Sequence, residues 1–513
     1  MCEVVREPDE DRFLGLALDA LPHARVPVEF EVTGIEPFDA YRRARSDDPS
    51  VFLETTGGQS GWGYFGVDPV ELITARQPAE TLDRGASPSL AGLAARLEDE
   101  TLVRGDCAIP VPCGLFGWLS YDLVRELESL PGGAVDDRRL PHLEFGLFDR
   151  VVAWEEPRTV GDPLHIVACP RIGGDPAGAF ERGRERASAL IDRIREGSPT
   201  IAGPPATPTA SFTSDTGRSD YVEQVERIKR YIRDGDTFQV NISHRLSAPA
   251  TIPPAAVYAA LRRVNPAPYS GLMELPSVDL VSASPELLLA VEDDTLATEP
   301  IAGTRPRGNT AAADRRLERE LRSDEKERAE HAMLVDLERN DLGKVARFGS
   351  VSVDEYRRVD RYSEVMHLVS RVSAELRPSV SLAGVCAADP LTPVESSPAD
   401  RLCAAIAALF PGGTITGAPK PRTMEIIDEL EATRRGPYTG SMAIIGFDRR
   451  AVLNMVIRTL VRHDDEYHLR VGAGIVHDSV PDREYDETMA KARALLNAVD
   501  DALADESTLE VVE

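Results

Sequence analysis

A glycine-rich segment over residues 410–420 carries the strongest chemical signal in the sequence. It reads Phe-Pro-Gly-Gly-Thr-Ile-Thr-Gly-Ala-Pro-Lys and precedes a segment typical of a helix over 424–430. Glycine has no Cβ, so backbone N–H groups in such a loop can approach an anion closely. A second cluster, Gly472-Ala473-Gly474, precedes a carboxylate-rich helix. These loops, together with a few local arginines or lysines, are the groups expected to hold an anionic substrate.

The predicted helix over 324–344 carries a carboxylate on its apolar stripe. Met333, Leu334 and Leu337 lie three, four and seven residues after Glu330, so all four share one face. A carboxylate is normally excluded from that face, and burying it unpaired is costly. Glu330 therefore needs a cation, which is either an arginine in a buried salt bridge or a metal ion.

The last predicted helix, over 481–503, offers further candidate ligands. Glu484, Glu487 and Lys491 lie at i, i+3 and i+7 and therefore share one face. The neighbouring stripe is apolar and consists of Tyr485, Met489, Ala492 and Leu496. Two carboxylates from this helix and Glu330 would suit a hard cation such as Mg²⁺, which prefers oxygen ligands. A solvated charged face explains the same pattern.

Three further residues are candidates whose surroundings also fit a structural role. His367 lies in the apolar run 365–369, where a histidine is more often a core residue than a catalyst. Arg458 lies inside a β-like apolar run over 455–459, so it needs a carboxylate partner, and a substrate carboxylate is one candidate. Tyr438, between Gly-Pro and Thr-Gly, is either a turn residue or a ligand contact.

The elements that must position these groups fall into two regions joined by a linker. Residues 196–217 are rich in Pro, Gly, Ser and Thr and separate an N-terminal region (20–195) from a C-terminal region (218–505). The N-terminal region mixes short β-like runs with helices, of which 180–194 is one. The C-terminal region opens with an amphipathic helix that Ser219 is expected to cap.

Strand-like runs dominate the rest of the C-terminal region. They lie at 238–242, 278–283, 287–291 and 440–447. Strands and helices interleave without a regular βαβ rhythm, so the predicted fold class is α+β with large antiparallel sheets. A second Pro/Ser-rich stretch over 377–399 is interpreted as a surface loop or an insertion.

The charge balance is strongly acidic. Asp and Glu number 86 against 58 Lys and Arg, the net charge is −28, and only five of the basic residues are Lys. This composition favours a protein that works at high salt, where self-repulsion is screened, although a GC-rich genome explains it too. In either case it argues against nucleic acid or an anionic membrane as a partner.

Compartment and size can be inferred from simple features. No apolar run approaches the roughly 20 residues that a membrane span needs, and the N-terminus lacks the layout of a signal peptide. Six scattered cysteines without a CxxC pair fit reduced, mostly buried thiols. We therefore expect a cytoplasmic protein, with enough chain in its 513 residues for one large core or two domains.

Taken in order, the motifs of 218–500 resemble those of chorismate-utilising enzymes that add ammonia to chorismate. That family includes component I of aminodeoxychorismate synthase and of anthranilate synthase, and the N-terminal region resembles it more loosely. The resemblance implies a sandwich of large antiparallel β-sheets flanked by helices, with the site between them. The motifs are GDTFQVNIS (235–243), SASPE (282–286), PIAGTRPRG (300–308), KERAEHAMLVDLERND (326–341), VMHLVS (365–370), FPGGTITGAPK (410–420), GPYTGSM (436–442), IRT (457–459) and GAGIVHDSVPDREYDET (472–488).

The resemblance also implies roles for individual residues. Mg²⁺ would grip the ring carboxylate of chorismate, and its ligands would be Glu330, Glu487 and, nearby, Glu484. The enolpyruvyl carboxylate would be held by Tyr438 and Arg458, assisted by N–H groups near Gly472 and Gly474, and Thr414 would be a further substrate-binding residue. The acid/base and catalytic candidates near the departing hydroxyl and pyruvate would be Glu286, His367 and Thr304, with Lys491 close to the metal. A dianion needs cations and N–H donors, and expelling a hydroxyl needs a proton donor.

Two positions bear on the reaction. Related enzymes that add water place a lysine base where this chain has Gln239, which favours ammonia as the nucleophile. The residues of the C-terminal motifs favour aminodeoxychorismate synthase, which makes 4-amino-4-deoxychorismate. Ala302 favours the alternative, anthranilate synthase, because aminodeoxychorismate synthases often carry a lysine there that is proposed to add to the ring. The resemblance of several motifs outweighs the single position Ala302, so the expected function is that of aminodeoxychorismate synthase.

The resemblance leaves partners and regulation to be tested. The chain has no G-x-C-x-G nucleophile segment, so a separate glutamine amidotransferase subunit is expected to supply ammonia. In anthranilate synthases a segment like Phe52-Leu53-Glu54-Thr55 binds tryptophan, which here would be an inhibitor, a structural ligand or absent. The alternative from a different functional class is a regulatory or scaffolding relative without catalytic activity.

Overall fold

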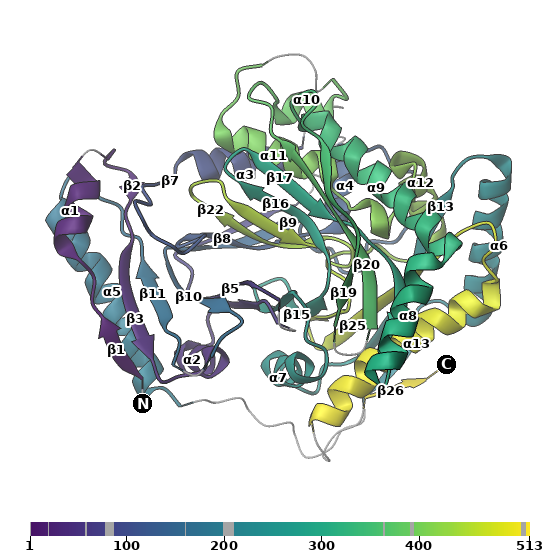
Figure 1. The fold of residues 1–513 in the computed structure, drawn as a ribbon, viewed down its shortest axis with the longest axis horizontal. Helices are drawn as coiled ribbons and strands as arrows, with labels where there is room; N and C mark the ends of the chain where they lie inside the picture. Colours follow the sequence, from purple (N-terminus) through teal and green to yellow (C-terminus); the bar gives the residue numbers. More distant parts are fainter. Residues whose placement is uncertain are drawn as a thin grey trace.

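The computed structural model describes residues 2–512 except 19, 57–58, 77–86, 160, 199–209, 363–364, 390–393 and 504–508. Its two large sheets are packed together with helices on their outer faces (Figure 1), as the α+β prediction requires. Almost all strand pairs are antiparallel, and β12–β26 is a parallel pair at the edge of the larger sheet.

The larger sheet has fourteen strands. In spatial order they are β1 (Glu3–Arg6), β3 (Val28–Thr33), β11 (Leu164–Ala168), β10 (Arg150–Glu156), β5 (Gly61–Val67), β4 (Ser50–Glu54), β14 (Tyr269–Glu274), β15 (Asp279–Ser284), β24 (Thr459–His463), β25 (Glu466–Ile475), β13 (Gln239–Pro249), β12 (Ala210–Ser214) and β26 (Leu509–Val512), with β21 (Gly417–Ala418) paired to β13.

The smaller sheet has ten strands. Their order is β18 (Ile301–Pro306), β20 (Val365–Glu375), β17 (Thr295–Glu299), β16 (Leu287–Glu292), β23 (Ala451–Asn454), β22 (Ser441–Gly446), β8 (Gly114–Leu119), β9 (Leu143–Phe148) and β6 (Glu71–Ala75), with β19 (Ser352–Arg361) paired to β20. A separate short pair joins β2 (Ala24–Arg25) to β7 (Thr101–Leu102).

Helices connect the strands and cover the sheets. In chain order they are α1 (Glu10–Leu18), α2 (Pro37–Ala44), α3 (Pro88–Glu98), α4 (Val124–Leu127), α5 (Pro176–Glu196), α6 (Arg218–Asp234), α7 (Pro254–Val264), α8 (Ala311–Ser323), α9 (Glu325–Val345), α10 (Leu382–Cys386), α11 (Pro398–Leu409), α12 (Lys420–Leu430) and α13 (Pro481–Leu503). No described helix is long and apolar enough to cross a membrane.

Strands from the two sequence regions alternate within both sheets. In the larger sheet β4 pairs with β14, so Phe52 lies opposite Leu272. In the smaller sheet β8 pairs with β22, so Gly117 lies opposite Ala443. The regions 20–195 and 218–505 are therefore segments of sequence rather than separate folding units. The described end of the predicted linker forms β12.

Two apolar cores explain why strands such as β4 are buried on both faces. Successive side chains of a strand point to opposite faces. Val51 and Leu53 belong to the core that the two sheets share with α3 and α11. Phe52 belongs to a second core, on the other face of the larger sheet. In Figure 1, α10 and α11 lie above the smaller sheet, and α2, α7 and α13 lie below the larger one.

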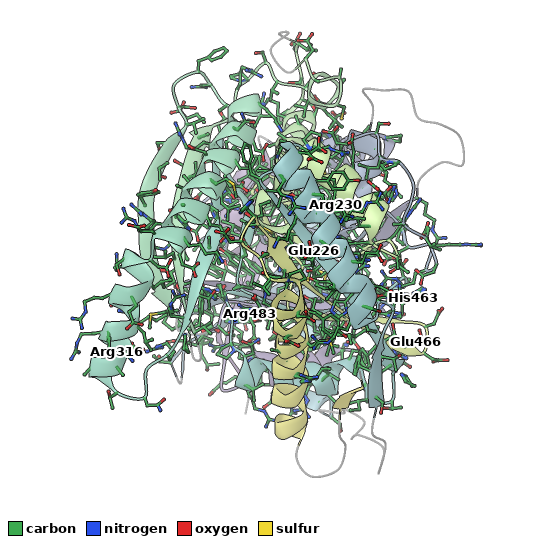
Figure 2. All side chains as sticks on the ribbon, turned by 90° about the vertical axis from the view of Figure 1, so that its right-hand side faces the viewer. Glu226, Arg230, Arg316, His463, Glu466 and Arg483 are labelled. Carbon is green, nitrogen blue, oxygen red and sulfur yellow. The ribbon has the colours of Figure 1, made fainter. Side chains whose placement is uncertain are left out.

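The second core is covered by helices with one apolar face. Figure 2 shows two of them, α6 and α13, side by side, with Glu226 and Arg230 of α6 and Arg483 of α13 labelled. Tyr221 and Val225 of α6 and Tyr485 of α13 are buried in this core. The charged residues of both helices therefore lie on the faces turned away from the sheet.

Most predicted elements are present, but the predicted cap of α6 is wrong. The helices α9 and α13 are confirmed, and the predicted strands correspond to β13, β15, β16 and β22. Ser219 does not cap α6, because the helix starts one residue before it and Gly217 is the N-cap without a side-chain bond. The stretch 377–399 is not wholly loop, because its described part contains α10 and Ser397, which caps α11. All six cysteines are free thiols.

Candidate functional site

The glycine-rich segment 410–420 forms a tight connection between α11 and α12. Gly413–Ile415 is a single 3₁₀ turn, and Gly417 and Ala418 pair with β13. At Gly417, φ is +122° and a Cβ would lie 2.0 Å from the Gln239 carbonyl oxygen, so only glycine fits. Lys420 points inward, where its Nζ donates to Leu409 O at 2.8 Å and pairs with Asp341. Lys420 therefore stabilises the turn rather than facing a ligand.

The second glycine cluster lies on β25, opposite β13. A Cβ at Gly472 would lie 2.9 Å from Asn241 Oδ1 and 3.0 Å from the Tyr438 hydroxyl. At Gly474 a Cβ would lie 2.6 Å from Gln239 Nε2. The absence of side chains here makes room for three polar groups that point at the same stretch of β25.

Glu330 is partly buried, and its partner is an amide rather than an arginine. Its Oε1 accepts a hydrogen bond from Gln239 Nε2 at 3.2 Å. Burial raises the pKa of Glu330, and the neighbouring carboxylates of Glu327 and Glu487 raise it further. The buried salt bridge to arginine that was one explanation of Glu330 is absent from the described residues. The carboxylate remains in an acidic neighbourhood, which favours a cation.

The helix α13 presents its predicted charged face beside this position. Tyr485, Met489 and Leu496 are buried, as expected for the apolar stripe. Glu484 is partly buried and Glu487 is exposed. Lys491 Nζ lies 2.8 Å from Glu487 Oε1 and donates to the Gly472 carbonyl at 3.2 Å. The last helix and the second glycine cluster thus meet at Lys491.

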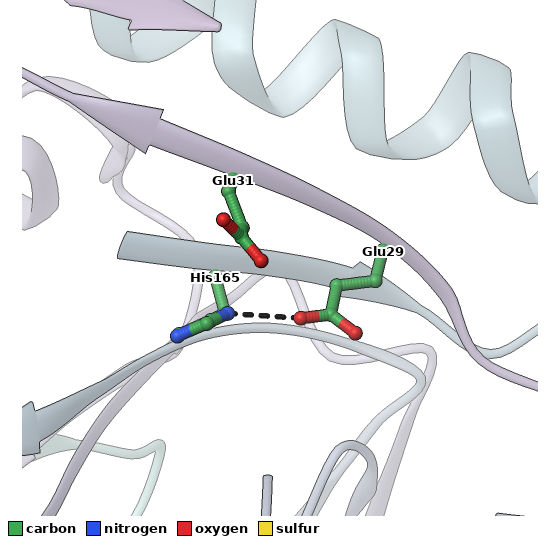
Figure 3. Close-up of side chains that lie close together, drawn as sticks. All are labelled: Glu29, Glu31 and His165. Atoms are coloured by element: carbon green, nitrogen blue, oxygen red, sulfur yellow. Dashed lines mark hydrogen bonds and ion pairs between the residues drawn. The ribbon is translucent and has the colours of Figure 1, made fainter. Parts of the chain in front are cut away.

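The three predicted metal ligands do not form a tight group. Among the described residues, three ligand atoms within 4.8 Å of one another occur at Glu29, Glu31 and His165 (Figure 3), and not at Glu330, Glu484 and Glu487. The Figure 3 cluster lies on β3 and β11, and its carboxylates already have partners. Glu29 accepts from His165 Nδ1 at 2.9 Å, and Glu31 accepts from Arg6 at 2.8 Å.

Glu286 is a buried carboxyl between the two sheets. It follows β15 and is 4% exposed. Its Oε1 accepts from the Ile301 N–H at 3.4 Å, and its side chain also bonds to Thr414. Burial raises the pKa of Glu286 to about 8, against the opposing effect of these two donors. Glu286 therefore holds its proton at neutral pH and can donate it.

His367 joins Thr304 and Arg458 into one cluster. Its Nδ1 lies 3.0 Å from Thr304 Oγ1, and its Nε2 lies 3.3 Å from Arg458 Nη2. Burial, and then the guanidinium, lower the pKa of His367 to about 3, so the ring is neutral. A guanidinium only donates, so Nε2 accepts and the ring proton sits on Nδ1.

Arg458 lies in an irregular segment, not in a strand as predicted. It precedes β24 and has a left-handed φ of +51°. Burial lowers the pKa of Arg458. No described carboxylate lies within ion-pair distance of it, so this guanidinium is available to an anionic ligand. The strand prediction failed because Met455 and Val456 are buried, and Ile457 is partly buried, in a loop rather than on a strand.

Tyr438 is buried beside a residue that sequence reasoning missed. Arg435 is 2% exposed, and its guanidinium lies 5.6 Å from the centre of the Tyr438 ring. Glu338 was also missed. It is 1% exposed on α9, with Oε2 3.4 Å from Thr298 Oγ1. The apolar stripe of α9 continues through Glu338 and is the signal that would have found it.

The tryptophan-site segment of the resemblance borders a cavity of about 460 Å³. Leu53, Glu54 and Thr55 line one side of it, and Tyr269 and Tyr362 line other parts. The Tyr362 ring also lies 5.6 Å from the His367 ring. The cavity therefore adjoins the cluster of His367, Thr304 and Arg458 without being part of it.

Known proteins are similar in sequence to this chain over nearly its whole length. An anthranilate synthase component 1 of Haloarcula marismortui is 57% identical over all of this chain and 98% of its own length, and another is 58% identical over 97% of both chains. Component 1 of the aminodeoxychorismate synthase of Bacillus subtilis is 41% identical over 91% of this chain and 94% of its own.

Solved structures agree in fold. Anthranilate synthase component I of Streptococcus pneumoniae superposes with a TM-score of 0.71 at 28% identity, covering 85% of this chain and 92% of its own. The menaquinone-specific isochorismate synthase of Escherichia coli gives 0.65 at 16% identity, covering 96% and 98%. The family model for chorismate binding enzymes matches residues 48–497. The chain therefore belongs to the chorismate-binding enzyme family.

Proposed function

We propose that the protein is component I of an anthranilate synthase, which converts chorismate and ammonia to anthranilate and pyruvate. The observation that carries this proposal is the 57–58% identity to anthranilate synthase components over essentially the whole chain, against 41% to an aminodeoxychorismate synthase component. The order of the two candidates is thus the reverse of the one expected from the C-terminal motifs. Ala302 supports it, because an alanine offers no nucleophile on β18.

The anionic substrate has matching groups in the site. Arg458 has no carboxylate partner among the described residues and is proposed to pair with the enolpyruvyl carboxylate, beside the Tyr438 hydroxyl. Thr414 and the backbone near Gly472 and Gly474 are proposed to border the same space. A buried, unpaired guanidinium is costly in the free protein and gains most from binding a carboxylate.

Proton transfer is assigned to the two buried groups between the sheets. Ammonia adds to the ring as the hydroxyl leaves, and Glu286 is proposed to supply the proton that turns this hydroxyl into water. A base must then take the ring proton as pyruvate leaves and the ring becomes aromatic. Neutral His367, held by Thr304 and Arg458, is proposed to orient substrate and to move that proton.

We propose that a magnesium ion binds in the acidic corner next to Gln239. Glu330, Glu484 and Glu487 are proposed to hold it, because carboxylate oxygens suit Mg²⁺ and the crowding that raises the pKa of Glu330 would be relieved by a cation. When bound, the ion would neutralise the ring carboxylate of chorismate. Lys491, next to Glu487, adds a second positive charge at this edge of the site.

Ammonia is proposed to come from a separate glutamine amidotransferase subunit. The chorismate-binding family model covers most of the chain, and the sequence has no segment of the glutaminase type. With ammonium salts the component should work alone, whereas with glutamine it should need its partner.

Product identification tests the proposal. The purified protein is incubated with chorismate, Mg²⁺ and ammonium at high salt, and the products are separated and weighed by mass spectrometry. Fluorescent 2-aminobenzoate formed without any other enzyme supports anthranilate synthase. If 4-aminobenzoate forms only after a 4-amino-4-deoxychorismate lyase is added, the enzyme is an aminodeoxychorismate synthase, the candidate favoured by the QVNIS and GGTITGAPK motifs. Chorismate binding without turnover would indicate a silent relative.

A further inference from the structure

A short turn of the N-terminal region grips the loop that carries Tyr438. The turn is Tyr121–Leu123, a 3₁₀ turn that Ser120 caps by accepting from the Asp122 N–H at 3.1 Å. Asp122 Oδ2 accepts from the Gly436 N–H at 2.8 Å, and the Tyr121 N–H donates to the Gly436 carbonyl at 2.8 Å. Both backbone polar groups of Gly436, two residues before Tyr438, are therefore held by the N-terminal region.

Arg138 reinforces this grip from a second N-terminal segment. Its Nη2 donates to the carbonyls of Arg434 and Arg435, each at 3.2 Å. Gly436 has a φ of +61°, and a Cβ there would lie 2.8 Å from Arg138 Nη2. Glycine at 436 thus satisfies the backbone conformation and also lets the guanidinium approach the loop.

Arg435 links this loop to the glycine-rich turn. Its guanidinium lies between the rings of Tyr121 and Tyr438, at 4.8 and 5.6 Å from their centres. It pairs with buried Glu431 at 2.7 Å and donates to Ile415 O at 3.0 Å. Ile415 directly follows Thr414. A shift of residues 434–438 would therefore move both Tyr438 and Thr414, the two residues proposed to face the substrate.

We propose that Asp122 is a positioning residue for chorismate binding, so that the N-terminal region completes the substrate site. Asp122 is 6% exposed, and its other oxygen accepts from Arg125 Nε at 3.2 Å, so the carboxylate is fixed from both sides. A hydrogen bond from a backbone N–H to an ionised carboxylate is among the stronger ones in proteins. The proposal rests on the assignment of Tyr438 to the substrate and not on which product is formed.

The decisive variant is Asp122→Asn, which keeps the shape but removes the charge. Chorismate affinity is measured by calorimetry with Mg²⁺ and no ammonia, and KM for ammonium and the melting temperature are measured in parallel. We expect the chorismate Kd to rise about tenfold, from loss of one charge-assisted hydrogen bond. KM for ammonium should stay unchanged, because Tyr438 does not face the nucleophile in this assignment.

Asp136→Asn is the matched control. Asp136 lies in the same segment as Arg138 and pairs with Arg434 of the same loop at 3.0 Å, but the pair is partly exposed and its loss should leave chorismate affinity unchanged. If Asp122→Asn does not fold, Arg138→Met, which removes the Nη2 group that donates to both carbonyls, is expected to weaken chorismate binding in the same direction.

Two outcomes overturn the proposal. One is wild-type chorismate affinity in the folded variant. The other is a uniform loss, in which the melting temperature falls and both substrates are affected alike, because this would mark a merely structural residue. A product other than anthranilate would refute the proposed function while leaving the affinity comparison between Asp122→Asn and Asp136→Asn to decide this one.

Discussion

At the end of β4, the Glu54 carboxylate is fully paired: Arg262 donates to it through Nε at 2.8 Å and Nη2 at 2.7 Å, and the Tyr258 hydroxyl donates at 2.7 Å. By contrast, among the described residues no carboxylate lies within ion-pair distance of Arg458, and no cation lies within that distance of Glu286. The two regions are built on the same sheets and have opposite arrangements of charge.

This difference separates groups that stabilise the fold from groups that are expected to bind a ligand. A paired buried charge has its desolvation offset in the free protein, whereas an unpaired one has it offset only when substrate binds. This criterion points to the guanidinium of Arg458, the partly buried carboxylate of Glu330 and the protonated carboxyl of Glu286, and away from Glu54. Substitutions at these four positions test the division, and the largest effect is expected at Glu330.

Glu330→Gln should lower Mg²⁺-dependent turnover by about 1000-fold or more, because a metal site that supplies several kcal/mol of charge stabilisation would lose a ligand. The circular dichroism spectrum and melting temperature should remain those of the folded protein. Glu325→Gln, an exposed change on the same helix, is the control. Full activity in Glu330→Gln would remove Glu330 from the metal site.

Arg458→Lys should raise KM for chorismate roughly 10- to 100-fold, since lysine keeps a charge but not the planar fork that pairs with a carboxylate. Because lysine keeps the positive charge that, together with burial, lowers the pKa of His367, that pKa should stay well below its ordinary value. NMR titration of the His367 ring measures this. An unchanged KM would contradict the carboxylate assignment.

The pH profile should report the proton on Glu286. Its pKa is raised to about 8, so kcat/KM should fall about tenfold for each pH unit above that value as the acid is lost. Folding stability should also fall as pH rises. In the unfolded chain this glutamic acid ionises near pH 4.5, whereas in the folded protein it stays neutral to about pH 8. The free energy of unfolding therefore decreases as pH rises between these two values. Glu286→Gln should remove this slope, and a variant that keeps it would identify another group.

Glu54→Gln should have the smallest effect on catalysis and should act on stability instead. Removing one partner of the Glu54–Arg262 pair should cost about 2 kcal/mol, below the value for a fully buried pair because Arg262 is 22% exposed. Urea unfolding measures the loss, and the kcat for anthranilate formation is the companion assay. A large fall in kcat with normal stability would place Glu54 among the functional groups.

Much of the fold could be predicted from local patterns, and less of the site. The helices α9 and α13 follow from apolar periodicity, and each predicted strand lies where a run of branched and aromatic residues lies. The sharing of both sheets by both regions was not predictable, because pairs such as Phe52 and Leu272 are set by tertiary packing. Glu338 lies on the apolar stripe of α9 and could have been found there, but Arg435 was missed for a related reason. A charged residue in a polar-looking segment looks exposed until the elements that bury it are known.

Interleaving also has a consequence for the order in which the protein can be made. The strand β8 leaves the ribosome early but finds its neighbour β22 only when residues 441–446 emerge, and β4 waits in the same way for β14. At ordinary rates of synthesis β8 waits for roughly tens of seconds. During that interval the edge of β8 that will pair with β22 has unpaired backbone N–H and C=O groups, which exposes the nascent N-terminal region to pairing with other chains.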